Sequence, residues 1–148
     1  MQDLLLIILI AVGFCVGFAA LWSGIVFLIS RMSGWARLAE EYPATGRIQG
    51  STYRYSSARL RFLTNYSNCL TVIVSSNGLY LEPMWAFRIG HSAMLIPRDA
   101  VLHYHKGAFP IFRSMRLKIK RRDGEPPTTI TLYGRGLADA LEQWLRAS

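Results

Sequence analysis

The chain has 148 residues, which leaves room for about one domain. Its two cysteines are Cys15, inside an apolar run, and Cys69, far beyond it, so the pattern indicates neither a disulfide scaffold nor an oxidising compartment. The net charge is +8, and the first thirty residues contribute only Asp3 to the charged side chains. The basic excess therefore belongs to the rest of the chain, where it favours nucleic acid, anionic lipid or an acidic protein as partner.

An uncharged apolar run extends from Leu4 to Ile29. About twenty apolar residues are enough for a helix to cross a bilayer, so this run predicts a transmembrane helix. A cleaved signal peptide would have a basic start, a shorter apolar core and a small-residue cleavage site, whereas this chain begins Met1-Gln2-Asp3. We expect a retained single-pass anchor over residues 1–31.

The charges that flank this run indicate its orientation. No Lys or Arg precedes it, whereas Arg31, Arg37 and Arg47 follow closely. Because cytoplasmic flanks carry the excess of Lys and Arg, we expect the C-terminal domain on the cytoplasmic side of the cell membrane, which is the inner membrane in a Gram-negative bacterium.

Four small residues lie on one face of the expected helix: Gly13, Gly17, Ala20 and Gly24. The first two form a GxxxG motif, a spacing that lets two membrane helices approach closely. One interpretation is helix pairing, in a homodimer or with a membrane-protein partner. The alternative is that these residues reflect only the high frequency of small residues in membrane helices.

Residues 32–46 predict a short juxtamembrane helix, capped by Ser33 and ended by Pro43. From residue 47 the apolar period approaches two, which is typical of strands. The sequence "SSNG" at 75–78 predicts a hairpin with a type I′ turn at Asn77-Gly78. The expected strands are Ile48–Tyr55, Arg59–Thr64, Leu70–Ser75, Leu79–Met84, Ala93–Ile96, Val101–Lys106, Met115–Arg121 and Thr128–Tyr133.

The chain ends in an amphipathic helix, whose apolar face is formed by Leu137, Leu141, Trp144 and Leu145. Short strands followed by one such helix predict a small mainly-β domain over residues 47–148, built as two bent antiparallel sheets or a partly open barrel and capped by the helix.

Three segments carry a resemblance to a known family: "NCLTVIVSSNGLYLE" (68–82), "AMLIPRDAVLHYHKG" (93–107) and "LKIKRRDGEPPTTITLYGRGLADALEQWL" (117–145). Over roughly residues 48–146, the order of elements resembles the pleckstrin-homology-like (PH-like) fold, including its bacterial and GRAM-type relatives. The resemblance implies about seven antiparallel strands with a C-terminal helix, and a binding module instead of a catalyst. The expected first loop at 55–59, followed by Arg61, lacks the basic signature of phosphoinositide-binding members.

The segment "RSMRLKIKRR" (113–122) places six basic side chains in ten positions. Apolar and basic residues alternate in it, so the basic set is expected to face solvent. The candidate anionic-surface residues are Arg116, Lys118, Lys120 and Arg122. A simple solvated face, an acidic protein and nucleic acid are the alternatives, and the strand lacks the stacking aromatics that a nucleic-acid site usually has.

The segment "MWAFRIGH" (84–91) is the second candidate contact surface. It places Trp85, Phe87 and Ile89 where a strand gives way to a loop. Exposed apolar patches usually mark contacts, so we expect these residues to meet a partner or the bilayer interface. The alternative is that they cover the open end of the barrel.

Chemistry-bearing motifs are absent from the sequence. His103 and His105 share a strand face but supply only half of a metal site. Neither a nucleotide-binding loop nor a nucleophile elbow is found. We therefore expect no enzyme activity, no metal and no cofactor.

Together these patterns predict a single-pass membrane protein that presents a PH-like binding or scaffolding domain at the membrane surface. This domain would recruit or regulate a membrane-protein partner, with anionic-lipid contact. The alternatives are an accessory subunit of a lipid- or envelope-processing membrane enzyme and, third, a membrane-tethered nucleic-acid binder.

Overall fold

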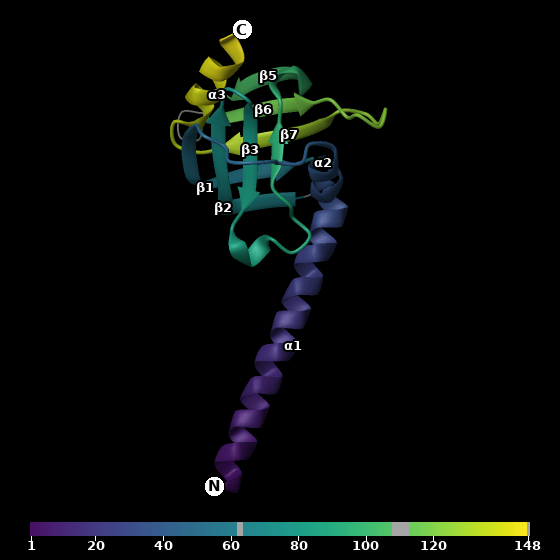
Figure 1. Cartoon of the computed structure of the whole chain (residues 1–148), viewed down its shortest axis with the longest axis vertical. Coiled ribbons are helices and arrows are strands. Elements are labelled where there is room, and N and C mark those ends of the chain that lie inside the picture. The colour runs from purple at the N-terminus through teal and green to yellow at the C-terminus, as the bar shows by residue number, and fades with distance from the viewer. Residues whose placement is uncertain (62–63, 108–112, 148) are drawn as a thin grey trace.

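The structure is a computed structural model that describes residues 1–61, 64–107 and 113–147. A long N-terminal helix projects from a β domain that carries a short helix at the junction and a second helix at its C-terminal end (Figure 1). This is the layout expected from the sequence.

The N-terminal helix α1 (Gln2–Ser33) is long and apolar enough to cross a membrane. At 1.5 Å per residue it extends for about 48 Å. Gly34 follows it with a φ of 83°, a left-handed conformation that ends the helix and redirects the chain into α2 (Trp35–Glu41). Ser33, predicted to cap this helix, is instead the last residue of α1, and Gly34 holds the N-cap position of α2. The hydroxyl of Ser33 still accepts the backbone N–H of Trp35 at 3.2 Å.

Seven antiparallel strands in the described residues form one curled sheet in the order β4-β3-β2-β1-β7-β6-β5. Strands β1 to β4 pair consecutively, as do β5 to β7. Strand β1 pairs with β7 to join the two groups, and β4 and β5 form the two edges of the sheet. The strands are β1 (Ser51–Leu60), β2 (Thr64–Ser75), β3 (Gly78–Pro83), β4 (Met94–Ile96), β5 (Val101–Gly107), β6 (Ser114–Ile119) and β7 (Thr128–Tyr133). Two short 3₁₀ turns, η1 (Trp85–Phe87) and η2 (Arg98–Ala100), lie in the connections.

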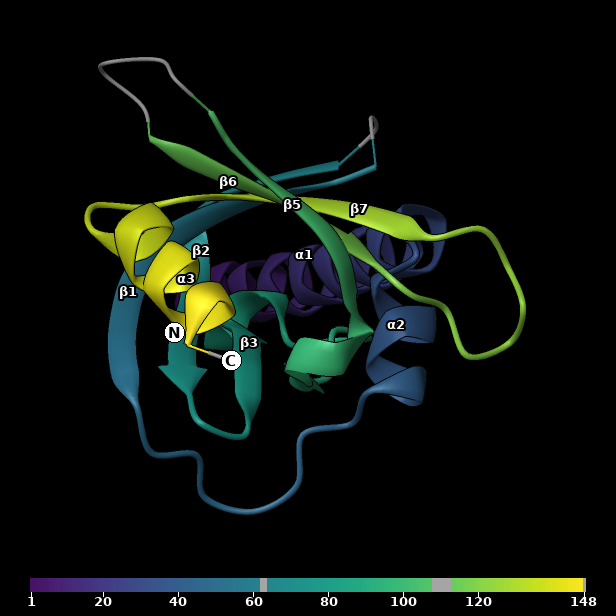
Figure 2. The ribbon, with the colours of Figure 1, turned by 90° about the horizontal axis from the view of Figure 1, so that it is seen from above.

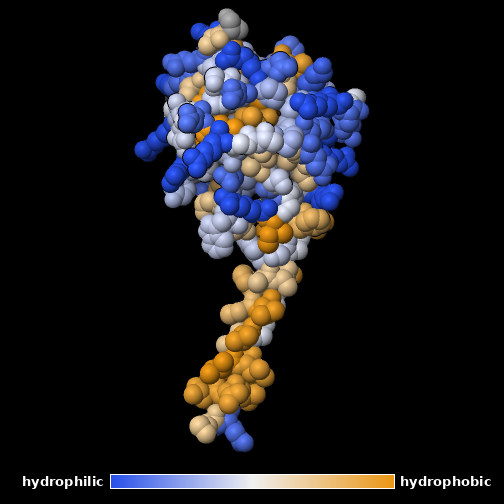
Figure 3. Space-filling model, viewed as in Figure 1, coloured by the Kyte–Doolittle hydropathy of each residue, from blue (hydrophilic) through white to orange (hydrophobic). Residues whose placement is uncertain are grey.

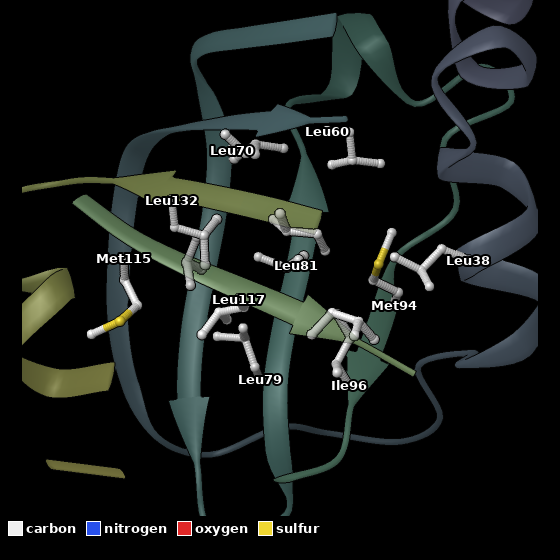
Figure 4. Packing of buried hydrophobic residues seen from close by; sticks show 14 of the residues in the cluster. Leu38, Leu60, Leu70, Leu79, Leu81, Met94, Ile96, Met115, Leu117 and Leu132 are labelled. Carbon is white, nitrogen blue, oxygen red and sulfur yellow. The ribbon is translucent and has the colours of Figure 1, made fainter. Parts of the chain in front are cut away.

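The core fills the inside of the curl (Figure 4). On β6 the side chains of Met115, Leu117 and Ile119 are fully buried, so the alternation predicted for this strand is confirmed. Helix α3 (Leu137–Arg146) packs on β2, β6 and β7 and covers one end of the curled sheet (Figure 2). It buries Trp144, as its apolar face predicted.

The first hairpin differs from the prediction. Residues 55–59, expected as a loop, lie inside β1, which continues to Leu60. The pairing of β1 with β2 shifts register between Tyr53 and Ser56, and Tyr55 has a φ of 55°. This bulge absorbs the Ser-rich segment without ending the strand.

The hairpin at 75–78 is in the predicted place, because Ser75 pairs with Gly78. The predicted turn type is wrong, since positive φ falls on Gly78 (150°) and not on Asn77. A Cβ at Gly78 would lie 2.6 Å from the carbonyl oxygen of Ile96. Glycine is therefore needed here for the close approach of β4.

Candidate functional site

The segment between β3 and β4, residues 84–93, passes beside the C-terminal third of α1 (Figure 1). We call it the junction loop. The indole N–H of Trp22 on α1 donates to the carbonyl oxygen of Ala86 at 3.1 Å. The rings of Trp22 and Phe87 meet edge to face, with their centroids 5.6 Å apart. These contacts fasten the loop to the helix two turns before Ser30.

A second contact lies farther along the helix. The hydroxyl of Ser30 donates to the carbonyl oxygen of Gly90. Gly90 has a φ of 74°, and a Cβ there would lie 2.9 Å from Cδ2 of Phe27. Only glycine allows this backbone conformation and this approach without displacement.

A buried polar cluster joins α1, α2, β2 and the junction loop. The hydroxyl of Tyr66 lies 3.0 Å from that of Ser33 and 2.9 Å from Nε2 of His91. The indole N–H of Trp35 donates to the carbonyl oxygen of Ser92 at 2.9 Å. Because buried polar groups without partners are costly, this network favours one arrangement of helix and domain.

The titrating members of this cluster are held neutral. Burial raises the pKa of Tyr66 to about 12, so its hydroxyl keeps its proton. Burial lowers the pKa of His91, against a smaller opposing effect of its hydrogen bond to the Ile89 carbonyl oxygen. A neutral ring with its proton on Nδ1 donates to Ile89 and accepts from Tyr66, which satisfies both nitrogens.

The outer side of the junction loop is apolar and open. Trp85 is 78% exposed, and Ile89 and Met84 are also exposed. Phe87 differs from the other residues of the predicted contact surface, because it packs against Trp22 and the core. The structure thus leaves Trp85 and Ile89 as the outward-facing pair.

Apolar side chains cover α1, whereas polar and charged ones dominate the visible face of the domain (Figure 3). On α1, the glycines of the predicted pairing face, Gly13, Gly17 and Gly24, have open space where a Cβ would stand, and Ala20 on the same face is exposed. Helix pairing stays a prediction.

The four predicted anionic-surface residues do not form one row. Arg116 and Lys118 point outward from β6, opposite His105 and His103 of β5. Lys120 lies just beyond the end of the strand. Arg122 lies in the following turn, and its guanidinium packs over the ring of Tyr42. Strands β5 and β6 occupy the end of the domain away from α1 (Figure 1).

One basic residue of this segment has a structural role that the sequence analysis missed. The side chain of Arg121 is 1% exposed and forms ion pairs with Glu41, Asp123 and Glu125. Its position continues the buried series 115-117-119, and this alternation was the available signal. The carboxylate of Glu41, eighty residues away in sequence, was not identifiable from local pattern.

The predicted half metal site gains no further ligand near His103 and His105. Within the described residues, no group of three or more His, Cys, Asp or Glu side chains lies close enough to hold a metal ion. Both histidines are exposed on β5.

A comparison of the chain with protein-family models and with curated protein sequences finds no match. The functional assignment therefore rests on the geometry of the junction and of the domain surface.

Proposed function

We propose that the protein is a single-pass membrane protein in which α1 anchors a PH-like domain against the membrane surface. The domain acts there as a binding or scaffolding module that recruits or regulates a membrane-protein partner. The observation that carries the proposal is the docking of the junction loop on α1 through Trp22, Ser30 and the Tyr66–His91 cluster. A helix held in this way sets the orientation of the domain as well as its location.

The position of the junction loop also indicates how deeply α1 is inserted in the bilayer. Irregular backbone does not lie in lipid hydrocarbon, so the hydrocarbon layer must end near the level of Trp22, where the loop begins its contact. A core of about 30 Å takes about twenty helical residues. The stretch from Leu4 to Ser23 has this length and carries no charge. Trp85 then lies at the headgroup level, where tryptophan is favoured.

In this arrangement the basic residues divide into two groups. Arg31 and Arg88 lie near the headgroups, and we assign the anionic-lipid contact of the domain to them. Glu82 neutralises Arg88 through an ion pair at 2.6 Å. Of the two arginines, Arg31 is therefore the one whose charge remains for an anionic lipid. Strand β6 lies at the other end of the domain, so Arg116 and Lys118 face the aqueous phase and its partners.

The excess of Lys and Arg after α1 supports a cytoplasmic domain at the cell membrane. The test uses full-length chains with one added cysteine, Gln2→Cys or Ser76→Cys, in a Cys15→Ser background; Cys69 is buried. With a membrane-impermeant maleimide on intact cells, we expect labelling at position 2 only. Position 76, at a hairpin tip, should react only after permeabilisation.

Two results would contradict the proposal. Release of the chain from membranes by alkaline carbonate would show that α1 does not span. Labelling of position 76 in intact cells would place the domain on the outer side.

A further inference from the structure

A groove of about 1030 Å³ lies along β1 and the turn between β7 and α3. Its volume lies at the upper end of the range for small-molecule pockets. Figure 1 places β1 and α3 on the flank of the domain opposite the junction of α1 with α2. A ligand in this groove would therefore come from the aqueous phase and not from the bilayer that holds α1.

One wall of the groove is a free strand edge. Strand β1 pairs with β7 only from Ser57 to Leu60, because β7 ends at Tyr133 and the chain turns into α3. Residues 52–56 line the groove, and no backbone hydrogen bond from outside the sheet reaches them within the described part of the chain. The bulge at Tyr55 interrupts this edge, so its regular part is 52–54, about 10 Å at 3.3 Å per residue, and this part can pair with another extended chain.

The groove carries an excess of positive charge. Arg54, Arg113 and Arg135 line it, against the single carboxylate of Asp139. That carboxylate is already bound by Lys106 at 2.7 Å and by Arg113 at 2.8 Å. Arg54 and Arg135 form no ion pair within the residues that the structure describes. A guanidinium group without an ion-pair partner can bind a carboxylate through two parallel hydrogen bonds, in a planar bidentate geometry.

The groove also contains two non-glycine residues with left-handed backbone, Tyr55 (φ 55°) and Asn68 (φ 51°). A pair of hydrogen bonds holds Asn68 in place, since its N–H donates to the Ser57 hydroxyl, which in turn donates to its Oδ1. Strained residues concentrate at sites that clamp ligands. Tyr55 lies within the free part of the β1 edge, and its side chain is exposed.

We propose that this groove binds an extended acidic segment of a partner protein, which adds as a strand to the free edge of β1 and pairs its carboxylates with Arg54 and Arg135. Backbone hydrogen bonds to β1 supply the affinity, and the arginines select for acidic side chains. The inference deepens the proposed function by naming the ligand chemistry of the domain.

The test uses the full chain in neutral detergent micelles, so that it does not depend on the orientation or depth of α1 in a membrane. The probe is the fluorescent peptide acetyl-ETETET, and acetyl-QTQTQT is its uncharged counterpart. The variant Arg54→Gln/Arg135→Gln removes the two unpaired charges. The matched control is Arg47→Gln/Arg59→Gln, which removes two exposed arginines that do not line the groove. Equal thermal unfolding of both variants establishes that they are folded.

We expect the acidic peptide to bind, with at least tenfold weaker affinity for the groove variant and a change below twofold for the control. Bound peptide should slow hydrogen exchange of the β1 amides at 52–55. No binding to the native chain, equal binding of both peptides, or equal loss in both variants would overturn the proposal. Full displacement by millimolar phosphate or by phosphatidylserine vesicles would also overturn it, since the groove would then be a site for single anions or headgroups.

Discussion

The two ends of the β domain use charged and polar side chains in opposite ways. At the end beside α1, the polar groups of Ser33, Tyr66 and His91 are buried, neutral and bonded to one another. At the far end and on the flank of β1, Arg116 and Arg54 are exposed and form no ion pair among the described residues.

This difference separates attachment from recognition. A buried, satisfied network stabilises one geometry and leaves no capacity for a new ligand. Exposed, unpaired cations contribute little to stability, but they are available to an acidic partner. We therefore expect substitutions near α1 to change the free energy of unfolding, and substitutions at the far end to change binding.

The largest contrast is expected between two tryptophans. Trp35 is 0% exposed at the junction, whereas Trp85 is 78% exposed on the loop beside it. Trp35→Ala should lower the free energy of unfolding of the β domain by about 3–5 kcal/mol, because it opens a cavity and orphans the Ser92 carbonyl. Trp85→Ala should change it by less than about 0.5 kcal/mol. Denaturant titration in micelles measures the free energy of unfolding of both variants. Equal losses would contradict the contrast between a buried, structural Trp35 and an exposed Trp85.

Within the basic segment, we expect one large effect beside a small one. Arg121→Met leaves Glu41, Asp123 and Glu125 facing one another without their shared cation. Because these carboxylates are partly solvated, the expected loss is about 2–3 kcal/mol, at or below the lower end for a broken buried ion pair. Lys118→Met, on the outer face of β6, should cost less than about 0.5 kcal/mol. Similar costs for the two would show that Arg121 is not the structural member of the segment.

A pair of glycines isolates the contact between the loop and the helix. Gly90 and Gly46 both have positive φ, of 74° and 79°, but only Gly90 would place a Cβ against Phe27. Gly46→Ala should cost about 1 kcal/mol for backbone conformation alone. Gly90→Ala should cost about 1 kcal/mol more, since the Phe27 side chain on α1 must shift to make room for the new Cβ. Thermal unfolding of both variants measures the difference, and no difference would mean that the loop does not press on α1.

The smallest effect expected is a pH dependence at the junction. The pKa of His91 is lowered by burial from its usual 6.5, so its ring stays neutral in the folded protein at pH values where the ring in the unfolded chain binds a proton. Stability should therefore be full above about pH 6.5 and fall as the pH drops from there toward the folded pKa. His91→Gln should flatten this part of the profile. An unchanged slope in that variant would remove His91 as its cause.

Local pattern in the sequence predicts much of the fold. The length of α1, the hairpin at 75–78, the alternation on β6 and the apolar face of α3 all follow from periodicity over a few residues. The bulge at Tyr55 could not be predicted in this way, because it depends on where β2 and β7 pair with β1.

The candidate site was only partly predictable for the same reason. The apolar residues of the junction loop are evident in the sequence, but Trp22 and Ala86 meet across 64 residues. In this contact Phe87 packs against Trp22, which leaves Trp85 facing outward. The groove beside β1 likewise brings Arg54 and Arg135 together through β-sheet pairing, with no local signal for either.

The depth of the junction loop in the membrane tests the central claim most directly. Spin labels at Trp85→Cys or Lys118→Cys, in a Cys15→Ser chain reconstituted in nanodiscs, can be compared for collision with oxygen and with a water-soluble nickel complex. The account predicts that position 85 lies at the headgroup level, favouring oxygen, while position 118 is fully accessible to nickel. Equal nickel accessibility at the two positions would show that α1 does not hold the domain against the bilayer.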